Sequence, residues 1–467
     1  MGERSSRRNS TLGILNGMLV NLGNAFVDPF TVLPVFITTF GGSTVLVGFV
    51  SATFFAGWFL PQVFVANVAQ ARKRVLPIYT ASAAFRFVGF AGAGASVFLI
   101  EPAHRSLILF CVCAGLSMNA LAAGVAAVPF LEITSKTVPL HKRGAFFAGR
   151  RVVGGVLGII AGLVIAAVLG GDPGAMWAQT GAYRAVTSVV DSIGWGGLEF
   201  PHDYGILIII GAVISTLGVV AYLFVDEPDA KHLAHVMPLR VYLTDGFRML
   251  KRAPDYRTFF WMRVFYQLTS MAFPFYATYA YARLGFSQAS VGVFVSIWLG
   301  AGVLSNAVWG RLLDRRGNRI VFVSTAAMSV VAPIAMLVLA SRRAPDAGLV
   351  EAGMFGLVAS TFLLNGFVRS GRFIANQTYL LESAPPERRP FYVGFMNSLS
   401  FPFMLSPILG GLVVATLGYR TLFAIGGLAA VGNVVASARL KEPRRRLVAA
   451  GEEAVPVCHD DLASLSE

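Results

Sequence analysis

The sequence predicts an all-α integral membrane protein with twelve transmembrane helices in two pseudo-symmetric six-helix bundles. Three observations lead to this prediction: the composition, a series of long apolar segments, and the placement of lysine and arginine. Of the 467 residues, 55% are hydrophobic and only 13% are charged, and the mean hydropathy is +0.67. An ordinary soluble protein has about 25% charged residues, so the bulk composition indicates a membrane protein.

The apolar segments have the length that a membrane-spanning helix needs. A spanning helix takes roughly 20 mostly apolar residues, because hydrocarbon satisfies no free backbone group. Division of the chain at its charged and Gly/Pro-rich stretches yields twelve such segments, at about 11–40, 44–66, 75–100, 106–132, 145–170, 205–225, 258–282, 288–313, 320–341, 351–381, 391–417 and 420–440.

The basic residues define the predicted orientation. With the N-terminus inside, the inner segments hold 28 of the 38 lysines and arginines, the outer segments hold 6, and 4 lie within spans. This asymmetry follows the positive-inside rule and predicts that both termini are cytoplasmic, in a bacterial plasma membrane. The net charge of +14 is then a signal of membrane orientation, and no nucleic-acid partner is expected.

The chain divides into five predicted parts. Residues 1–10 form a cytoplasmic N-terminus, 11–225 and 258–441 the two bundles, 226–257 a cytoplasmic linker with a surface helix, and 442–467 a cytoplasmic tail. The outer segment 172–204 contains an amphipathic stretch suited to the membrane surface. Ordered matches between the halves at a drifting offset, such as Pro29-Phe30 with Pro274-Phe275 and Leu131-Glu132 with Leu381-Glu382, indicate an internal duplication.

One loop sequence resembles a motif of the major facilitator superfamily. The stretch GRLLDRRGNR is similar to the loop motif of that family, and its matching residues are Gly310, Asp314, Arg315, Gly317 and Arg319. The first-half counterpart, ANVAQARKR, has Ala66 and Gln70 in place of the glycine and the aspartate. The resemblance implies a monomeric secondary transporter that works by alternating access, with spans one, four, seven and ten around a central cavity and the loop as a gate. Gly310 would permit close helix approach, and Asp314 would lie at the positive end of a neighbouring helix.

Polar residues form a stripe on three of those four spans. At 100° per residue, each set falls within a wedge of about 60°. The sets are Asn21, Asn24 and Asp28; Arg263, Gln267, Ser270 and Pro274; and Asn365, Arg369, Arg372 and Asn376. Arg86 on the third span and Tyr266 beside the stripe of the seventh are further candidates for substrate contact. We expect these stripes to converge on one aqueous cavity.

Asp28 is the only ionisable residue between Asn9 and Thr44, and it has two interpretations. As a functional group it carries a proton, because burial and a nearby arginine act in opposite directions on the charge of a carboxyl group. As a structural group it caps a broken helix, since Asp followed by Pro suits a helix start. The arginines predict a substrate with an anionic group, held by Arg369 and Arg372, because a guanidinium matches a carboxylate or phosphate.

Other classes of function have weaker support in the sequence. An uncoupled facilitator or exchanger, or an exporter of drugs or metabolites, has the same fold. A membrane enzyme would need motifs such as His-Glu-x-x-His or a nucleophile elbow, and a non-transporting receptor is supported only by the degraded first-half loop. No Walker-type loop occurs, and the three cysteines have no metal-like spacing. We therefore expect no enzyme activity, cofactor or metal; the expected partners are a small-molecule substrate, protons and the lipid bilayer.

Overall fold

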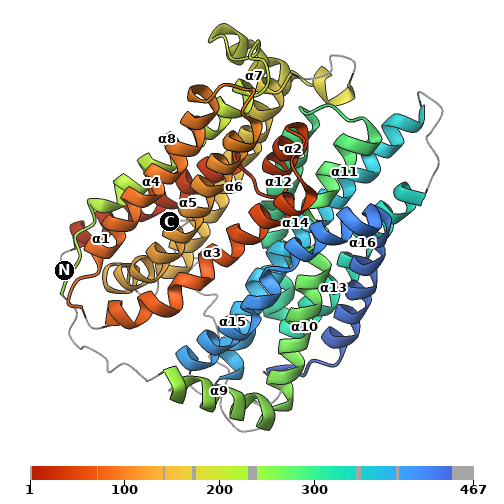
Figure 1. The fold of residues 1–467 in the computed structure, drawn as a ribbon. Coiled ribbons are helices and arrows are strands. Elements are labelled where there is room, and N and C mark those ends of the chain that lie inside the picture. The colour runs from red at the N-terminus through yellow and green to blue at the C-terminus, as the bar shows by residue number, and fades with distance from the viewer. Residues whose placement is uncertain are drawn as a thin grey trace, which may run out of the picture.

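The computed structural model describes residues 3–443 apart from 71, 140–141, 171–174, 230–238, 342–348 and 385–388. The predicted tail from residue 444 and part of the predicted linker lie outside this range. The regular elements within it are helices (Figure 1). Those of the first half are α1 (Glu3–Ala25), α2 (Val32–Thr39), α3 (Thr44–Gln70), α4 (Leu76–Leu99), α5 (Arg105–Thr137), α6 (Arg143–Val168), the short η2 (Met176–Gln179), α7 (Gly181–Ser192) and α8 (His202–Leu223).

The second half repeats this order after a helix in the predicted linker. Its elements are α9 (Leu239–Arg252), α10 (Pro254–Ser270), α11 (Pro274–Leu284), α12 (Ser290–Arg316), α13 (Asn318–Ser341), α14 (Leu349–Ser383), α15 (Arg389–Met404) and α16 (Ser406–Ala438). Gly418, with φ of 83°, interrupts α16 close to the predicted boundary between the last two spans.

The first and seventh predicted spans are each divided into two helices. Pro29 has no amide hydrogen and Pro274 opens α11, so neither position continues the preceding helix. Asp28 stabilises the first break: its Oδ1 accepts hydrogen bonds from the backbone N–H of Phe30 at 3.0 Å and from Thr31 Oγ1 at 2.8 Å. The matched prolines of the two halves therefore mark the same structural feature.

Eight of the described helical segments are long and apolar enough to cross a membrane. One of them, Phe391–Ala438, contains two of the predicted spans. The predicted spans outside these eight segments are the two broken ones and the one that corresponds to α14, which carries two arginines and begins next to undescribed residues. The helical membrane architecture is thus confirmed, and the count of twelve stays a prediction.

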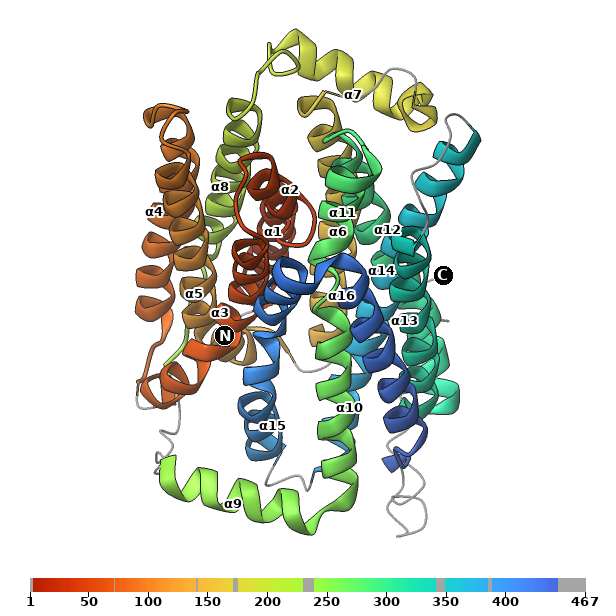
Figure 2. The same ribbon diagram turned by 45° about the vertical axis from the view of Figure 1, so that its right-hand side comes forward.

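Helices of the same half pack on one another, and further contacts join the halves. In the first half α4 packs on α5 and α8, α3 on α5, and α1 on α6 and α8; in the second half α12 and α13 pack on α14, and α10 and α13 on α16. Between the halves, α6 packs on α12, α3 on α15 and α16, and α2 on α11. Figure 2 shows α7 across one end of the molecule and α9 across the other, and these ends are called the α7 face and the α9 face below.

The hydrophobic core differs between the two faces. Toward the α7 face, residues of both halves form one continuous cluster, which includes Phe36 of α2 and Tyr276 of α11. Toward the α9 face, each half has its own cluster, one around Phe259 and Tyr379 and the other around Tyr79 and Tyr222. Apolar packing therefore holds the halves together at the α7 face, whereas at the α9 face each half has a hydrophobic core of its own.

Candidate functional site

A cavity of about 220 Å³ lies between the two halves, beside the break in the first predicted span. It is lined from the first half by α1, the segment 26–31, α3 and α6, and from the second half by α12 and α14. The polar, charged and aromatic residues that line it include Asn21, Asn24, Asp28, Phe30, Phe54, Arg151, Trp298, Asn306, Arg369 and Ser370. The structure thus brings Asn21, Asn24, Asp28 and Arg369 of the predicted site together.

Asp28 has a structural contact and also lines the cavity. Its Oδ1 holds the helix break, as described above. The side chain is 5% exposed and lines the cavity. Both interpretations of Asp28 in the sequence are compatible with this geometry, because the carboxylate caps the helix break and belongs to a residue that lines the cavity.

Arg369 approaches the cavity from α14 and is surrounded by aromatic rings. Its guanidinium carbon lies 4.9 Å from the ring centroid of Trp298, 5.7 Å from that of Phe55 and 6.0 Å from that of Phe30. These are cation–π distances. Arg369 interacts electrostatically with Asp28, but the two side chains form no ion pair within the described part of the chain.

Arg151 was missed as a site residue. From the sequence, Arg151 counts among the 28 basic residues of the inner segments, whereas the structure places it in the third turn of α6, where it lines the cavity. Its guanidinium stacks on Phe373 of α14 at 3.5 Å, so it contacts the opposite half. The pair Arg150-Arg151 at the start of an apolar segment is the signal in the sequence, because adjacent side chains on a helix point about 100° apart and the two guanidinium groups therefore face different neighbours.

Arg86 and Arg372 lie inside single halves, away from this cavity. Arg86 donates to Asn119 Oδ1 and to Ser215 Oγ, each at 3.3 Å, and so joins α4, α5 and α8. Arg372 is 2% exposed and donates to Asn433 Oδ1 at 2.7 Å. The expectation that Arg369 and Arg372 hold one substrate group together does not fit this arrangement, because the side chains point to different neighbours.

The other candidates of the seventh and tenth spans also pack within the second half. Tyr266 lies under the Arg372 guanidinium at 4.7 Å, and the backbone oxygen of Gln267 accepts a hydrogen bond from Ser406. Asn365 donates to the Thr361 carbonyl of its own helix, and the Oδ1 of Asn376 is buried without a hydrogen-bond partner. None of these four residues lines the cavity described above.

Among the described residues, the predicted gating loop forms hydrogen bonds with residues of its own half. Gly317 ends α12 with φ of 81°, a conformation that favours glycine. Arg319 donates its backbone N–H to Glu442 Oε2 and a guanidinium N–H to the Ala438 carbonyl. A surface cavity lies beside these contacts, and Asp314 and Arg315 also line it. A Cβ added at Gly310 would meet open space, so the expected close helix approach does not occur there in this structure.

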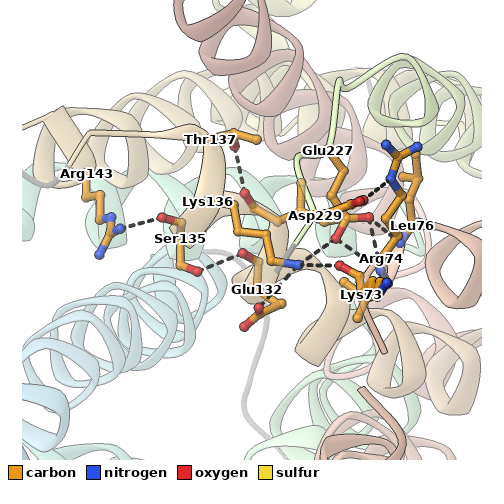
Figure 3. Close-up of polar contacts among 12 residues, drawn as sticks. Lys73, Arg74, Leu76, Glu132, Ser135, Lys136, Thr137, Arg143, Glu227 and Asp229 are labelled. Carbon is orange, nitrogen blue, oxygen red and sulfur yellow. Dashed lines mark hydrogen bonds and ion pairs between the residues drawn. The ribbon is translucent and has the colours of Figure 1, made fainter. Parts of the chain in front are cut away.

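The first half has an equivalent arrangement around Glu227 (Figure 3). The Glu227 carboxylate accepts the backbone N–H groups of Val75 and Leu76, at the start of α4, and pairs with Lys136 at 2.9 Å. Nearby, Arg74 contacts Asp229 at 2.6 Å and holds the pKa of that carboxyl below its usual value of 3.8. Glu227 and Glu442 are both followed by proline after the last helix of a half, so the duplication extends to these capping groups.

Comparisons with known proteins agree with the fold. The family model described as Major Facilitator Superfamily matches residues 13–341 and 258–458. No curated protein matches the chain by sequence. Among solved structures, a mutant of the nucleoside transporter NupG is similar with a TM-score of 0.66 at 15% identity, covering 94% of this chain and 100% of that one. A D-xylose–proton symporter is similar with a TM-score of 0.61 at 13% identity, covering 94% and 98%.

A third similar structure is a bacterial homologue of the human lysosomal transporter Spinster, in an inward-facing and unoccupied conformation. Its TM-score is 0.58 at 15% identity, covering 96% of this chain and 94% of that one. At these identities the likeness shows the fold alone.

Proposed function

The chain belongs to the Major Facilitator Superfamily, and from this premise we propose that it is a secondary transporter in which the cavity beside Asp28 binds a small molecule. The family and the transporter fold indicate a transporter and not an enzyme. In this proposal residues 11–225 and 258–441 form two helical bundles, and residues 226–257 form a cytoplasmic linker between them. The protein acts as a monomer and binds its substrate at the interface of the two bundles.

The position of the cavity between the cores is the observation that supports alternating access. Both halves line it; the α7-face side is closed by a shared hydrophobic core, and the α9-face side has two separate cores. Such an arrangement is one state of a carrier whose halves rock around a central site. The positive-inside rule predicts that the α9 face is cytoplasmic, so the separate cores at that face support an inward-facing state, which we propose for a bacterial plasma membrane.

Coupling to protons through Asp28 is the second part of the proposal. An ionisable group at membrane depth is costly and marks a functional pathway unless it is paired, and Asp28 lines the cavity close enough to Arg369 for electrostatic interaction. Protonation of Asp28 removes that interaction and leaves Arg369 available to a substrate. An uncoupled facilitator or exchanger, or an exporter, would use the same cavity without this step.

Uptake measurements test the proposal. The purified full chain is screened against a collection of metabolites by thermal shift, and each ligand found is offered to proteoliposomes with and without an inward proton gradient. A proton-coupled transporter accumulates the ligand only with the gradient, and Asp28→Asn removes that dependence while Asp191→Asn, an exposed carboxylate of α7, retains it. Binding without flux indicates a receptor, product formation an enzyme, and equilibration unaffected by the gradient an uncoupled carrier.

A further inference from the structure

The arginines of the embedded helices fall into two groups. Four of them donate hydrogen bonds to side chains of the protein: Arg86 to Asn119 and Ser215, Arg150 to Asn16, Arg263 to Asn397, and Arg372 to Asn433. Arg151 and Arg369 donate none to any described residue, and neither forms an ion pair there. Each guanidinium has five N–H donors, so these two side chains carry unused donor capacity.

Both unpaired guanidinium groups line the same cavity, and they come from opposite halves. Arg151 is on α6 and Arg369 on α14, and each interacts with the charge of the other. Among the described residues that line the cavity, Asp28 is the one carboxylate, and one of its oxygens already accepts hydrogen bonds from Phe30 and Thr31. Two positive groups against one negative group give the cavity a net positive charge, which attracts an anion.

The size and the walls of the cavity restrict the anion further. A cavity of about 150 Å³ holds benzene, and pockets for drug-sized ligands start at about 300 Å³. The volume of about 220 Å³ lies between these values and suits one ring with a small substituent. Trp298, Phe30 and Phe54 provide an aromatic wall, and Asn21, Asn24 and Asn306 provide polar groups.

Resting on the proposed transport function, we propose that the substrate is a small organic monoanion, whose carboxylate or similar oxyanion is held between Arg151 and Arg369 and whose ring-sized apolar part packs on Trp298 and Phe30. A guanidinium fork matches two carboxylate oxygens in one plane. Arg151 stacks on Phe373, and binding transfers its guanidinium to the anion. Because the two arginines belong to different halves, one bound anion reduces the repulsion between them and connects α6 to α14.

Benzoate, benzamide and nitrate are suitable probes of this site. Benzoate has the ring and the charge, benzamide has nearly the same shape without the charge, and nitrate has the charge without the ring. Calorimetric titration of the full chain in detergent is expected to show benzoate binding at least tenfold tighter than either of the others. Arg151→Gln and Arg369→Gln should each weaken benzoate binding at least tenfold, whereas Arg420→Gln, an exposed arginine of α16, should change it less than twofold.

Arg151→Lys keeps the charge and loses the fork, so it should retain part of the affinity and controls for loss of folding in the glutamine variant. Equal binding of benzamide and benzoate would overturn the recognition of charge, and equal binding of nitrate would overturn the recognition of a ring. Absence of benzoate binding to the unmodified chain would overturn the substrate class.

Spin labels separate failure of this inference from failure of the transport function. Pairs at Arg105 and Arg420, on the α7 face, and at Lys73 and Arg316, on the α9 face, report the separation of the halves; all four residues are exposed. Opposite changes of the two distances between pH values, without a response to benzoate, would refute only the substrate class. Fixed distances under every condition would refute alternating access itself.

Discussion

The packing of α6 on α12 offers a direct test of the closed α7 face. Gly162 lies in backbone contact with α12: an added Cβ would lie 2.7 Å from the backbone nitrogen of Ser296 and closer still to the Gly292 carbonyl oxygen. Real Cβ atoms essentially never approach within 3.0 Å, and no rotation of a side chain relieves a clash with backbone. Gly162→Ala therefore forces the two helices apart where the halves meet.

The cost of such overpacking is about 1–3 kcal/mol. It applies only to the state in which α6 and α12 are in contact, so it shifts the equilibrium toward opening of the α7 face by roughly 5- to 150-fold. The gain in helix propensity from Gly to Ala, about 1 kcal/mol, is present in both states and cancels. The spin-label pair at Arg105 and Arg420 should then show a larger population at long distance than the unmodified protein.

Gly92→Ala is the matched control, because an added Cβ at this helical glycine of α4 meets nothing within 4 Å. It should leave the distance distribution unchanged. An unchanged distribution in Gly162→Ala, with the protein folded, would refute the reasoning that backbone contact between α6 and α12 keeps the α7 face closed.

Three further outcomes are expected. Arg372→Ala should lower the melting temperature, because it removes a large side chain that is 2% exposed together with its hydrogen bond to the buried Asn433, yet change benzoate affinity less than twofold in the titration used above. Glu227→Ala should destabilise the protein by about 1–3 kcal/mol in denaturant unfolding, since the backbone N–H groups of Val75 and Leu76 lose their acceptor; Glu101→Ala, an exposed residue, is its control, and equal midpoints would contradict the prediction. Arg74 lowers the pKa of Asp229, so the stabilisation by this pair is present above pH 3.8 and is lost as the pH falls through the lowered pKa; Asp229→Asn should remove that step from the pH dependence of the unfolding midpoint.

Much of the architecture could be predicted from the sequence because it depends on periodic and compositional features. The spans follow from apolar length, and the breaks at Asp28-Pro29 and Pro274 follow from the missing amide hydrogen of proline. The duplication was visible at these prolines and is extended by Glu227 and Glu442, which occupy equivalent positions after α8 and α16.

The choice among the arginines could not be predicted. Arg369 and Arg372 differ by only about 60° around the axis of α14, so a helical wheel assigns both to one stripe. A wedge of that width covers the cavity on one side and the neighbouring helix on the other. The structure places Arg369 in the cavity and Arg372 against Asn433.

Length, hydrophobicity, charge asymmetry and the proline breaks determined, from sequence alone, a helical membrane protein of this superfamily with a polar face near Asp28. Only the tertiary structure decided that Arg151 of the first half and Arg369 of the second half line one cavity, while Arg86 and Arg372 donate hydrogen bonds within a single half. The physical reason is that a sequence specifies the angle between side chains on one helix, whereas the direction of that helix toward its neighbours results from the packing of the whole molecule.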